Sequence, residues 1–130
     1  DYAIHIFHEA LKKGSYASFL SATTELPMMY MDDAIRGTIE LMDAPAQQIS
    51  IRSSYNFGGV NFTPEVLAAE IRKHIPEFKL TYVENDPRQE IANSWPQSID
   101  DSYAIKDWLW KPEFDLVRMT EDMLKNIKKS

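Results

Sequence analysis

The chain has 130 residues, of which 44% are hydrophobic and 26% are charged, and its formal net charge is -6. This length is enough to bury one hydrophobic core. The sequence has no cysteine, which excludes a disulfide framework, thiol catalysis and a zinc finger, and it has no apolar run long enough to span a membrane. Its acidic balance is unfavourable for binding nucleic-acid phosphates. We therefore expect one cytoplasmic globular domain without a nucleic-acid or membrane partner.

The first third of the chain predicts a helix, two extended segments and a second helix. Apolar residues recur at helical spacing from Ile4 until Gly14, a typical helix end. Residues 16–20 predict a strand, and residues 26–31 predict an extended run because Leu26 precedes a proline. Asp32 predicts the N-cap of a helix that continues to about residue 42. The expected buried face of this helix consists of Ala34, Ile35, Ile39 and Met42.

The middle of the chain predicts two strands on either side of a helix. Residues 49–57 favour a strand because they contain good strand formers, and Gly58-Gly59 ends it. Thr63 followed by Pro64 is typical of a helix start, and the helical pattern continues to residue 75. Residues 79–83 predict another short strand.

Three helices are predicted in the last third. The first covers residues 87–95, the second begins at capping residues in 98–101 and ends near Trp108, and the last begins at Asp115. The apolar stripe of the last helix consists of Leu116, Met119, Met123 and Ile127. Helices alternate with strands in the front part, which predicts an α/β fold whose strands complete a larger parallel sheet.

Several polar clusters have a structural interpretation. His5, His8 and Glu9 do not follow the spacing of a zinc protease helix, so a solvated helix face is favoured over a metal site. The pairs Asp32-Asp33 and Asp100-Asp101 each stand at a predicted helix start, where carboxylates cap backbone N–H groups. We therefore interpret both pairs as caps rather than as acid–base pairs.

Two apolar features leave a choice between binding and packing. The run that contains Met28 and Met29 suits either the wall of a small-molecule pocket or an ordinary buried strand. Trp95 lies between a polar helix and Pro96, which suits either a rigid pocket wall or a packing anchor. Trp108 and Trp110 are predicted to be core residues.

Six parts of the sequence together resemble one enzyme family, the NAD-dependent L-threonine 3-dehydrogenases of the extended short-chain dehydrogenase/reductase type. The strings Met28-Met29-Tyr30-Met31 and Ser94-Trp95-Pro96 are the most specific. The wider matching segments are 26–34, 51–56, 62–64, 75–78, 91–96, and 100–102 with 106–108. The resemblance extends over essentially all of residues 1–130 and corresponds to the family's C-terminal, substrate-binding portion, which implies that the N-terminal NAD-binding Rossmann part lies outside this chain.

The resemblance implies an enzyme that oxidises L-threonine at C3 to 2-amino-3-ketobutyrate with NAD. It also implies a homodimer, and a mitochondrial location if the source is eukaryotic. It places Trp95 in the substrate pocket, with Met28 and Met29 nearby. No tyrosine is followed four positions later by lysine, and no G-x-G-x-x-G is present, so we assign no catalytic, NAD-binding or metal-binding residue and expect this segment alone to be inactive.

Two alternatives remain open. One is a portion of a related NAD-dependent epimerase or reductase that acts on a nucleotide-sugar, although residues 28–30 lack the basic groups that such relatives use for the diphosphate. The other is a free-standing interaction module. The sequence also departs from the family at Leu109, where a glycine is usual, which puts the turn at this position in doubt.

Overall fold

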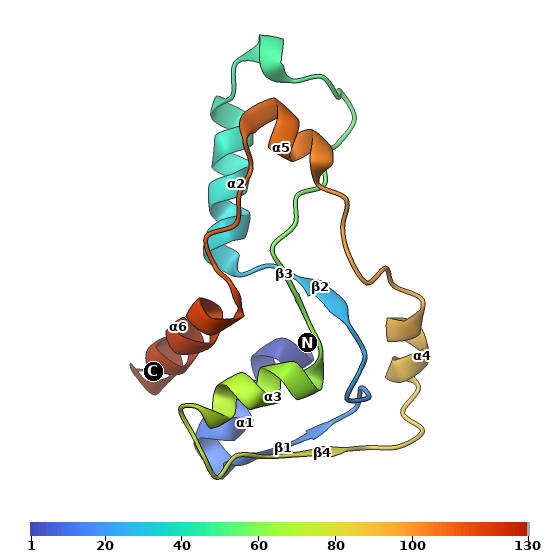
Figure 1. The fold of residues 1–130 in the computed structure, drawn as a ribbon, viewed down its shortest axis with the longest axis vertical. Helices are drawn as coiled ribbons and strands as arrows, with labels where there is room; N and C mark the ends of the chain where they lie inside the picture. Colours follow the sequence, from blue (N-terminus) through green and yellow to red (C-terminus); the bar gives the residue numbers. More distant parts are fainter. Residues whose placement is uncertain (130) are drawn as a thin grey trace.

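The chain alternates short strands with helices, as the computed structural model of residues 1–129 shows (Figure 1). In chain order the elements are α1 (Tyr2–Lys13), β1 (Ser15–Ser18), β2 (Leu26–Met28), α2 (Met31–Asp43), the 3-10 helix η1 (Ala46–Gln48), β3 (Val60–Phe62), α3 (Pro64–Arg72), β4 (Lys79–Tyr82), α4 (Arg88–Asn93), α5 (Ser102–Trp108) and α6 (Leu116–Lys129). In the described part of the chain, no helix has both the length and the apolar character needed to cross a bilayer.

Strands β1 and β4 pair in parallel, with Ser15 opposite Lys79 and Ser18 opposite Tyr82. Parallel strands require a long crossover connection, and here α2, β3 and α3 lie between them in the sequence. Helices α1 and α3 lie beside this pair (Figure 1). The predicted α/β fold with parallel strands is therefore confirmed.

Strands β2 and β3 form a separate antiparallel pair, with Leu26 opposite Phe62 and Met28 opposite Val60. Gly59, just before β3, allows the two backbones to approach closely: a Cβ at this position would stand 2.6 Å from the carbonyl oxygen of Met28. The pair lies between the α1–α3 region and the α2–α5 region of the molecule (Figure 1).

The main hydrophobic core forms where α1, α3 and α6 meet the strands. Ile6 and Phe7 of α1, and Leu67 and Ile71 of α3, are fully buried, and Met119 of α6 packs with them. Side chains cap the starts of α1 and α3. Thr63 accepts the N–H of Val66, as predicted for α3, and Asp1 accepts the N–H of Ala3 at the start of α1.

The strand predicted over residues 49–57 is wrong. In the structure η1 ends at Gln48, the backbone that follows it is irregular, and the strand begins only at Val60. Side-chain contacts hold this stretch instead of a ladder: the N–H of Ile51 donates to the Tyr55 hydroxyl, which donates to Asp107 of α5 at 2.5 Å. Ser50 donates to the same carboxylate through its backbone N–H and its hydroxyl. A segment anchored to a helix in this way does not require a neighbouring strand.

The predicted buried face of α2 is also wrong. Ile35, Ile39 and Met42 are exposed, whereas Asp33 and Gly37 are buried. The reason is that the 110–114 segment packs on the opposite side of the helix from the apolar stripe. Gly37 makes room for it, because a Cβ there would lie 2.6 Å from the ring of Phe57 and 2.7 Å from that of Trp110.

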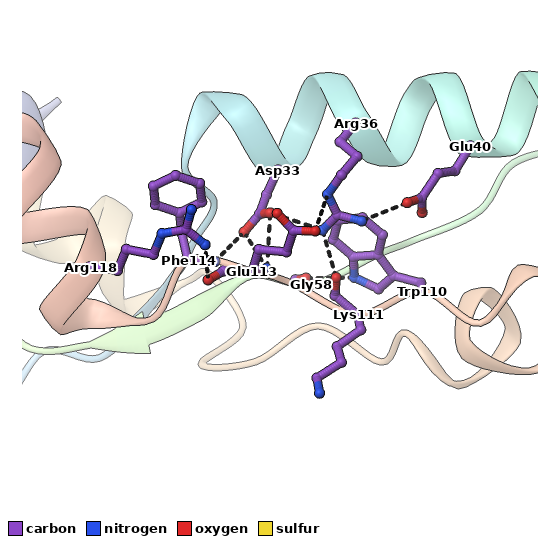
Figure 2. A network of polar contacts seen from close by, with 9 residues as sticks. All are labelled: Asp33, Arg36, Glu40, Gly58, Trp110, Lys111, Glu113, Phe114 and Arg118. Atoms are coloured by element: carbon purple, nitrogen blue, oxygen red, sulfur yellow. Dashed lines mark hydrogen bonds and ion pairs between the residues drawn. The ribbon is translucent and has the colours of Figure 1, made fainter.

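A polar network joins α2 to the segment that leads into α6 (Figure 2). Asp33, 1% exposed, accepts the backbone N–H groups of Glu113 and Phe114. Arg36 is paired with Asp33 at 3.0 Å and donates to the carbonyl of Lys111 at 2.6 Å. The Arg36 guanidinium also lies 4.8 Å from the centroid of the Trp110 ring. These contacts fix the C-terminal segment on α2.

The two aspartate pairs differ in how far they act as the predicted helix caps. Helix α2 begins after Tyr30 without a side-chain cap, so the predicted capping role of Asp32 is wrong, and Asp33 binds a distant segment instead. In the second pair, Asp100 accepts the N–H of Ser102 at 3.0 Å, as a capping carboxylate does. Its neighbour Asp101 makes no capping bond and accepts the N–H of Gly58 at 3.3 Å.

The turn at Leu109 has the backbone conformation that glycine adopts most easily. Leu109 ends α5 in the left-handed region, with φ 59° and ψ 38°, and its side chain is 82% exposed. Its N–H still closes the helix by donating to Ile105. Leu109 therefore adopts the turn conformation that a glycine would adopt, and its backbone is strained as a result. Of the two tryptophans predicted to be in the core, Trp110 is 2% exposed, and Trp108 is partly buried.

Candidate functional site

A mainly apolar cavity of about 380 Å³ lies where the start of α1, the end of β1, strand β2 and helix α4 meet. Its lining residues are Asp1, Tyr2, Phe19, Leu20, Leu26, Met28, Arg88, Ile91, Ala92 and Trp95. A concave site of this size suits a small molecule, and its apolar walls suit a ligand with an aliphatic part.

One face of α4 and the residues after it form a wall of this cavity. Arg88, Ile91, Ala92 and Trp95 all line it, at positions that follow the i, i+3, i+4, i+7 spacing of a helix face. Of these four residues, only Trp95 was predicted from the sequence to lie in the pocket. The other three residues could have been predicted from the sequence, because they lie three, four and seven positions before Trp95 and so share its helix face.

Helix α4 is held in place by Gln89, which lies on its other side. The side chain of Gln89 accepts the backbone N–H of Ser21 at 2.7 Å and donates to the hydroxyl of Thr24 at 3.0 Å. These bonds connect α4 to the turn between β1 and β2. The cavity wall is therefore positioned by side-chain hydrogen bonds rather than by a continuous sheet. These bonds join residues that are more than 60 positions apart in the sequence.

Trp95 stands at the end of this wall. Its backbone N–H donates to Ala92, and its side chain is 59% exposed although it lines the cavity. Pro96 restricts the backbone of Trp95, and the indole itself offers a large, flat apolar surface. Because it is open on one side, Trp95 is available to a ligand rather than enclosed by the chain's own core.

Arg88 is a charged residue in this mainly apolar lining. Its Nε donates to Oδ1 of Asp86 at 2.9 Å and its Nη2 donates to Oδ2 at 2.7 Å. The Arg88 guanidinium also lies 3.7 Å from the centroid of the Phe19 ring. Hydrogen bonds from the Arg88 side chain and backbone lower the pKa of Asp86 to about 2, so the pair is ionised near neutral pH.

The predicted substrate-binding residues are placed in different environments. Met28 and Trp95 line the same cavity. Met29 is not a lining residue; it follows β2 and approaches Gly59, where a Cβ would stand 2.9 Å from the Met29 Cα. The structure therefore brings together two of the three residues.

Tyr2 contributes a buried hydroxyl group near the cavity. Its side chain is 2% exposed, and its hydroxyl has no hydrogen-bond partner among residues 1–129. Burial, and to a smaller extent the neighbouring Tyr16, raise the pKa of Tyr2 above its ordinary value. This hydroxyl therefore stays protonated near neutral pH.

The histidines of α1 lie apart from this cavity. His5, His8 and Glu9 border a shallow surface depression with Tyr16. Across residues 1–129, no group of three or more His, Cys, Asp and Glu side chains could hold a metal ion. The candidate site is therefore the cavity bordered by α4 and β2.

Comparison with known proteins first defines a class. No family model matches the chain. An uncharacterised epimerase/dehydratase of Staphylococcus haemolyticus is 48% identical over 128 residues, which are 98% of this chain and 40% of that protein. A GalE-like L-threonine dehydrogenase of Cupriavidus necator in its apo form is 54% identical with a TM-score of 0.93, over 98% of this chain and 45% of that one. The fold is thus that of a segment of the α/β dehydrogenases and epimerase/dehydratases.

Other relatives carry a more specific name. Mitochondrial L-threonine 3-dehydrogenase of Bos taurus is 52% identical over 124 residues, or 95% of this chain and 33% of that protein. The L-threonine dehydrogenase of Phytophthora infestans has a TM-score of 0.94 at 49% identity, over 98% of this chain and 41% of that one. The chain is a C-terminal segment that matches the L-threonine 3-dehydrogenase and GalE-like epimerase/dehydratase family, so the predicted resemblance is confirmed. It spans a third to under half of these relatives.

Proposed function

We propose that residues 1–130 are the substrate-binding portion of an enzyme that oxidises L-threonine at C3 to 2-amino-3-ketobutyrate with NAD. The observation that carries the proposal is the cavity at α4, where Trp95 and Met28 converge in a chain that is about half identical to L-threonine dehydrogenases. This reaction removes a hydride from C3 and a proton from the hydroxyl group of the substrate.

The cavity suits the shape of L-threonine. The methyl group would pack on the indole of Trp95 and on Met28, two apolar groups that exclude water from the reacting carbon. Met29 supports this wall indirectly, through the close packing of its backbone on Gly59. Trp95, Met28 and Met29 are therefore the residues that we assign to substrate binding and its support.

The residues described here do not themselves fit NAD, which accepts the hydride when it is bound. A dinucleotide site needs a glycine-rich turn between a strand and a helix. The four glycines of this chain stand elsewhere: Gly14 ends α1, Gly37 is packed inside α2, and Gly58-Gly59 precede β3. We infer that NAD is bound mainly by an N-terminal part outside this chain, and we assign no cofactor contact to residues 1–130.

The test is NADH formation by the full-length protein with NAD and, in turn, L-threonine, L-serine and a nucleotide-sugar. We expect a strong signal with L-threonine and a weak one with L-serine, because L-serine lacks the methyl group that the cavity would bind. A folded, NAD-binding protein without activity on L-threonine would overturn the proposal. Activity on the nucleotide-sugar would instead favour an epimerase or reductase, the name carried by the staphylococcal relative.

We further infer that the full-length protein forms a homodimer, without nucleic-acid or membrane partners. We infer a cytoplasmic location, or a mitochondrial one in a eukaryote, as for the bovine relative. One similar structure is of a monomeric L-threonine 3-dehydrogenase, so a monomer is the alternative, and the mass in solution decides between the two states. A monomer by light scattering would overturn the dimer without affecting the activity.

A further inference from the structure

We propose that the guanidinium group of Arg88 binds the carboxylate of the amino-acid substrate, an inference that rests on the function proposed above. Arg88 lies on the same wall as Trp95 and contributes a positive charge to a lining that is otherwise mainly apolar. A carboxylate needs such a partner when it leaves water for an apolar cavity, because an unpaired buried charge is costly.

The guanidinium is held ready for a ligand. Asp86 fixes it through two hydrogen bonds, at 2.9 and 2.7 Å, and the ring of Phe19 supports its flat face. Phe19 and Arg88 both line the cavity, so this stacked pair borders the space that a ligand would occupy. A cation that is already ordered loses less conformational entropy when it binds an anion.

Donor groups remain available after these contacts are made. A guanidinium has five N–H donors, and Asp86 takes one from Nε and one from Nη2. Nη1 has no hydrogen-bond partner within residues 1–129. The two N–H groups of Nη1 and the second of Nη2 can therefore donate to a carboxylate.

The charge balance favours a carboxylate over a diphosphate. Asp86 offsets the charge of Arg88, and its repulsion of a ligand grows with each negative charge that the ligand carries, so a diphosphate is disfavoured more than a monocarboxylate. The other charged lining residue is Asp1, whose Oδ1 accepts the N–H of Ala3 at the start of α1. A zwitterionic amino acid with a small apolar side chain matches this lining better than a nucleotide-sugar does.

The test compares L-threonine with L-threoninamide, in which a neutral amide replaces the carboxylate, in the full-length enzyme and its Arg88→Gln variant. Threoninamide is followed as a substrate, or as a competitive inhibitor if it is not oxidised. We expect Arg88→Gln to raise KM for L-threonine about tenfold or more while kcat changes less, because a ground-state contact is lost. The KM or inhibition constant of threoninamide should change by less than about twofold.

Two further variants separate binding from structure. Arg88→Lys keeps the positive charge but loses the planar guanidinium that can bind a carboxylate through two N–H groups. Its affinity for L-threonine should therefore lie between those of Arg88→Gln and the unmodified enzyme. Arg118→Gln is the matched control, because Arg118 also stacks on an aromatic ring, that of Phe114, but does not line the cavity. It should leave both constants unchanged.

The outcomes distinguish this proposal from the proposed function. An unchanged KM for L-threonine in Arg88→Gln, or an equal rise for both ligands, would show that Arg88 has only a structural role. If the unmodified enzyme oxidises the nucleotide-sugar instead of L-threonine, the proposed function and this inference both fail. Normal activity on L-threonine with an unchanged Arg88→Gln variant overturns this inference alone.

Discussion

The buried carboxylate of Asp33 accepts the backbone N–H of Phe114 at 2.9 Å, across 81 residues of sequence. Its oxygens also accept the N–H of Glu113, at 3.0 and 3.1 Å. Both donors lie just before α6, in irregular backbone that belongs to neither a helix nor a strand. The Asp33 carboxylate therefore replaces the backbone carbonyls that would accept these N–H groups in a helix or sheet, since buried N–H groups need an acceptor.

We predict that Asp33→Ala lowers the free energy of unfolding by about 3 kcal/mol, because it leaves the two N–H groups and Arg36 without their acceptor. Asp32→Ala is the matched control, since Asp32 is exposed on the same turn, and it should change stability by less than about 0.5 kcal/mol. Denaturant unfolding of the full-length protein, followed by fluorescence of the nearby Trp110, measures both. Equal effects of the two substitutions would contradict the role of Asp33.

The same carboxylate should make stability depend on pH. Burial alone would raise the pKa of Asp33, but the hydrogen bonds from Glu113, Phe114 and Arg36 outweigh it and lower the pKa below its ordinary value. A lowered pKa adds stability above the unfolded value of about 3.9, and this contribution is lost as pH falls through the folded pKa. The stability gap between the unmodified protein and Asp33→Asn should therefore be full near neutral pH and shrink below about pH 4. A gap that is constant over this range would contradict the assignment.

Gly37→Ala should destabilise the protein although alanine favours helices. An added methyl group would stand 2.6 and 2.7 Å from the rings of Phe57 and Trp110, which must move. Overpacking of this kind costs about 1–3 kcal/mol, more than the gain of about 1 kcal/mol in helix propensity. Thr38→Ala, at an exposed position of the same helix, is the control and should be close to neutral. Thermal unfolding gives the sign: a stabilised Gly37→Ala variant would mean that the rings do not pack there.

Leu109→Gly should stabilise the protein by about 1 kcal/mol, because it relieves the cost of a left-handed conformation for a residue with a side chain. The exposed leucine side chain makes few contacts to lose. Leu109→Ala keeps the Cβ and the strain, so it serves as the comparison and should show no such gain. If both substitutions have the same effect, the conformation at this turn is not the cause.

Trp95→Ala in the full-length enzyme should raise KM for L-threonine or lower kcat by about tenfold or more, equivalent to about 1.4 kcal/mol. The reason is loss of the apolar surface that, in the proposed function, would pack on the substrate. Tyr103→Ala removes another exposed aromatic side chain, on α5 and away from the cavity, and should leave the kinetics unchanged. Unchanged kinetics in a folded Trp95→Ala variant would remove Trp95 from the site.

Some features followed from local sequence alone because their cause is local. Gly14 ends α1, and Thr63-Pro64 starts α3, because caps and turn residues act within a few positions of the chain. The tryptophan of the Ser94-Trp95-Pro96 string could be singled out in the same way, from the residues beside it. The α/β order followed from apolar periodicity, which reports the local backbone conformation.

Other features were decided only by contacts between distant segments. Periodicity placed Ile35 and Ile39 in the core, but the 110–114 segment packs on the opposite side of α2 and buries Asp33 and Gly37 instead. Residues 49–57 have strand propensity, yet none of the strands described within residues 1–129 pairs with them, and Asp107 anchors them instead. The arrangement of Arg88 likewise depends on tertiary contacts, because Asp86 binds its guanidinium and the ring of Phe19 stacks on it. Propensity and spacing describe a helix or a strand in isolation, whereas burial and charge placement depend on which distant surface the fold brings against it.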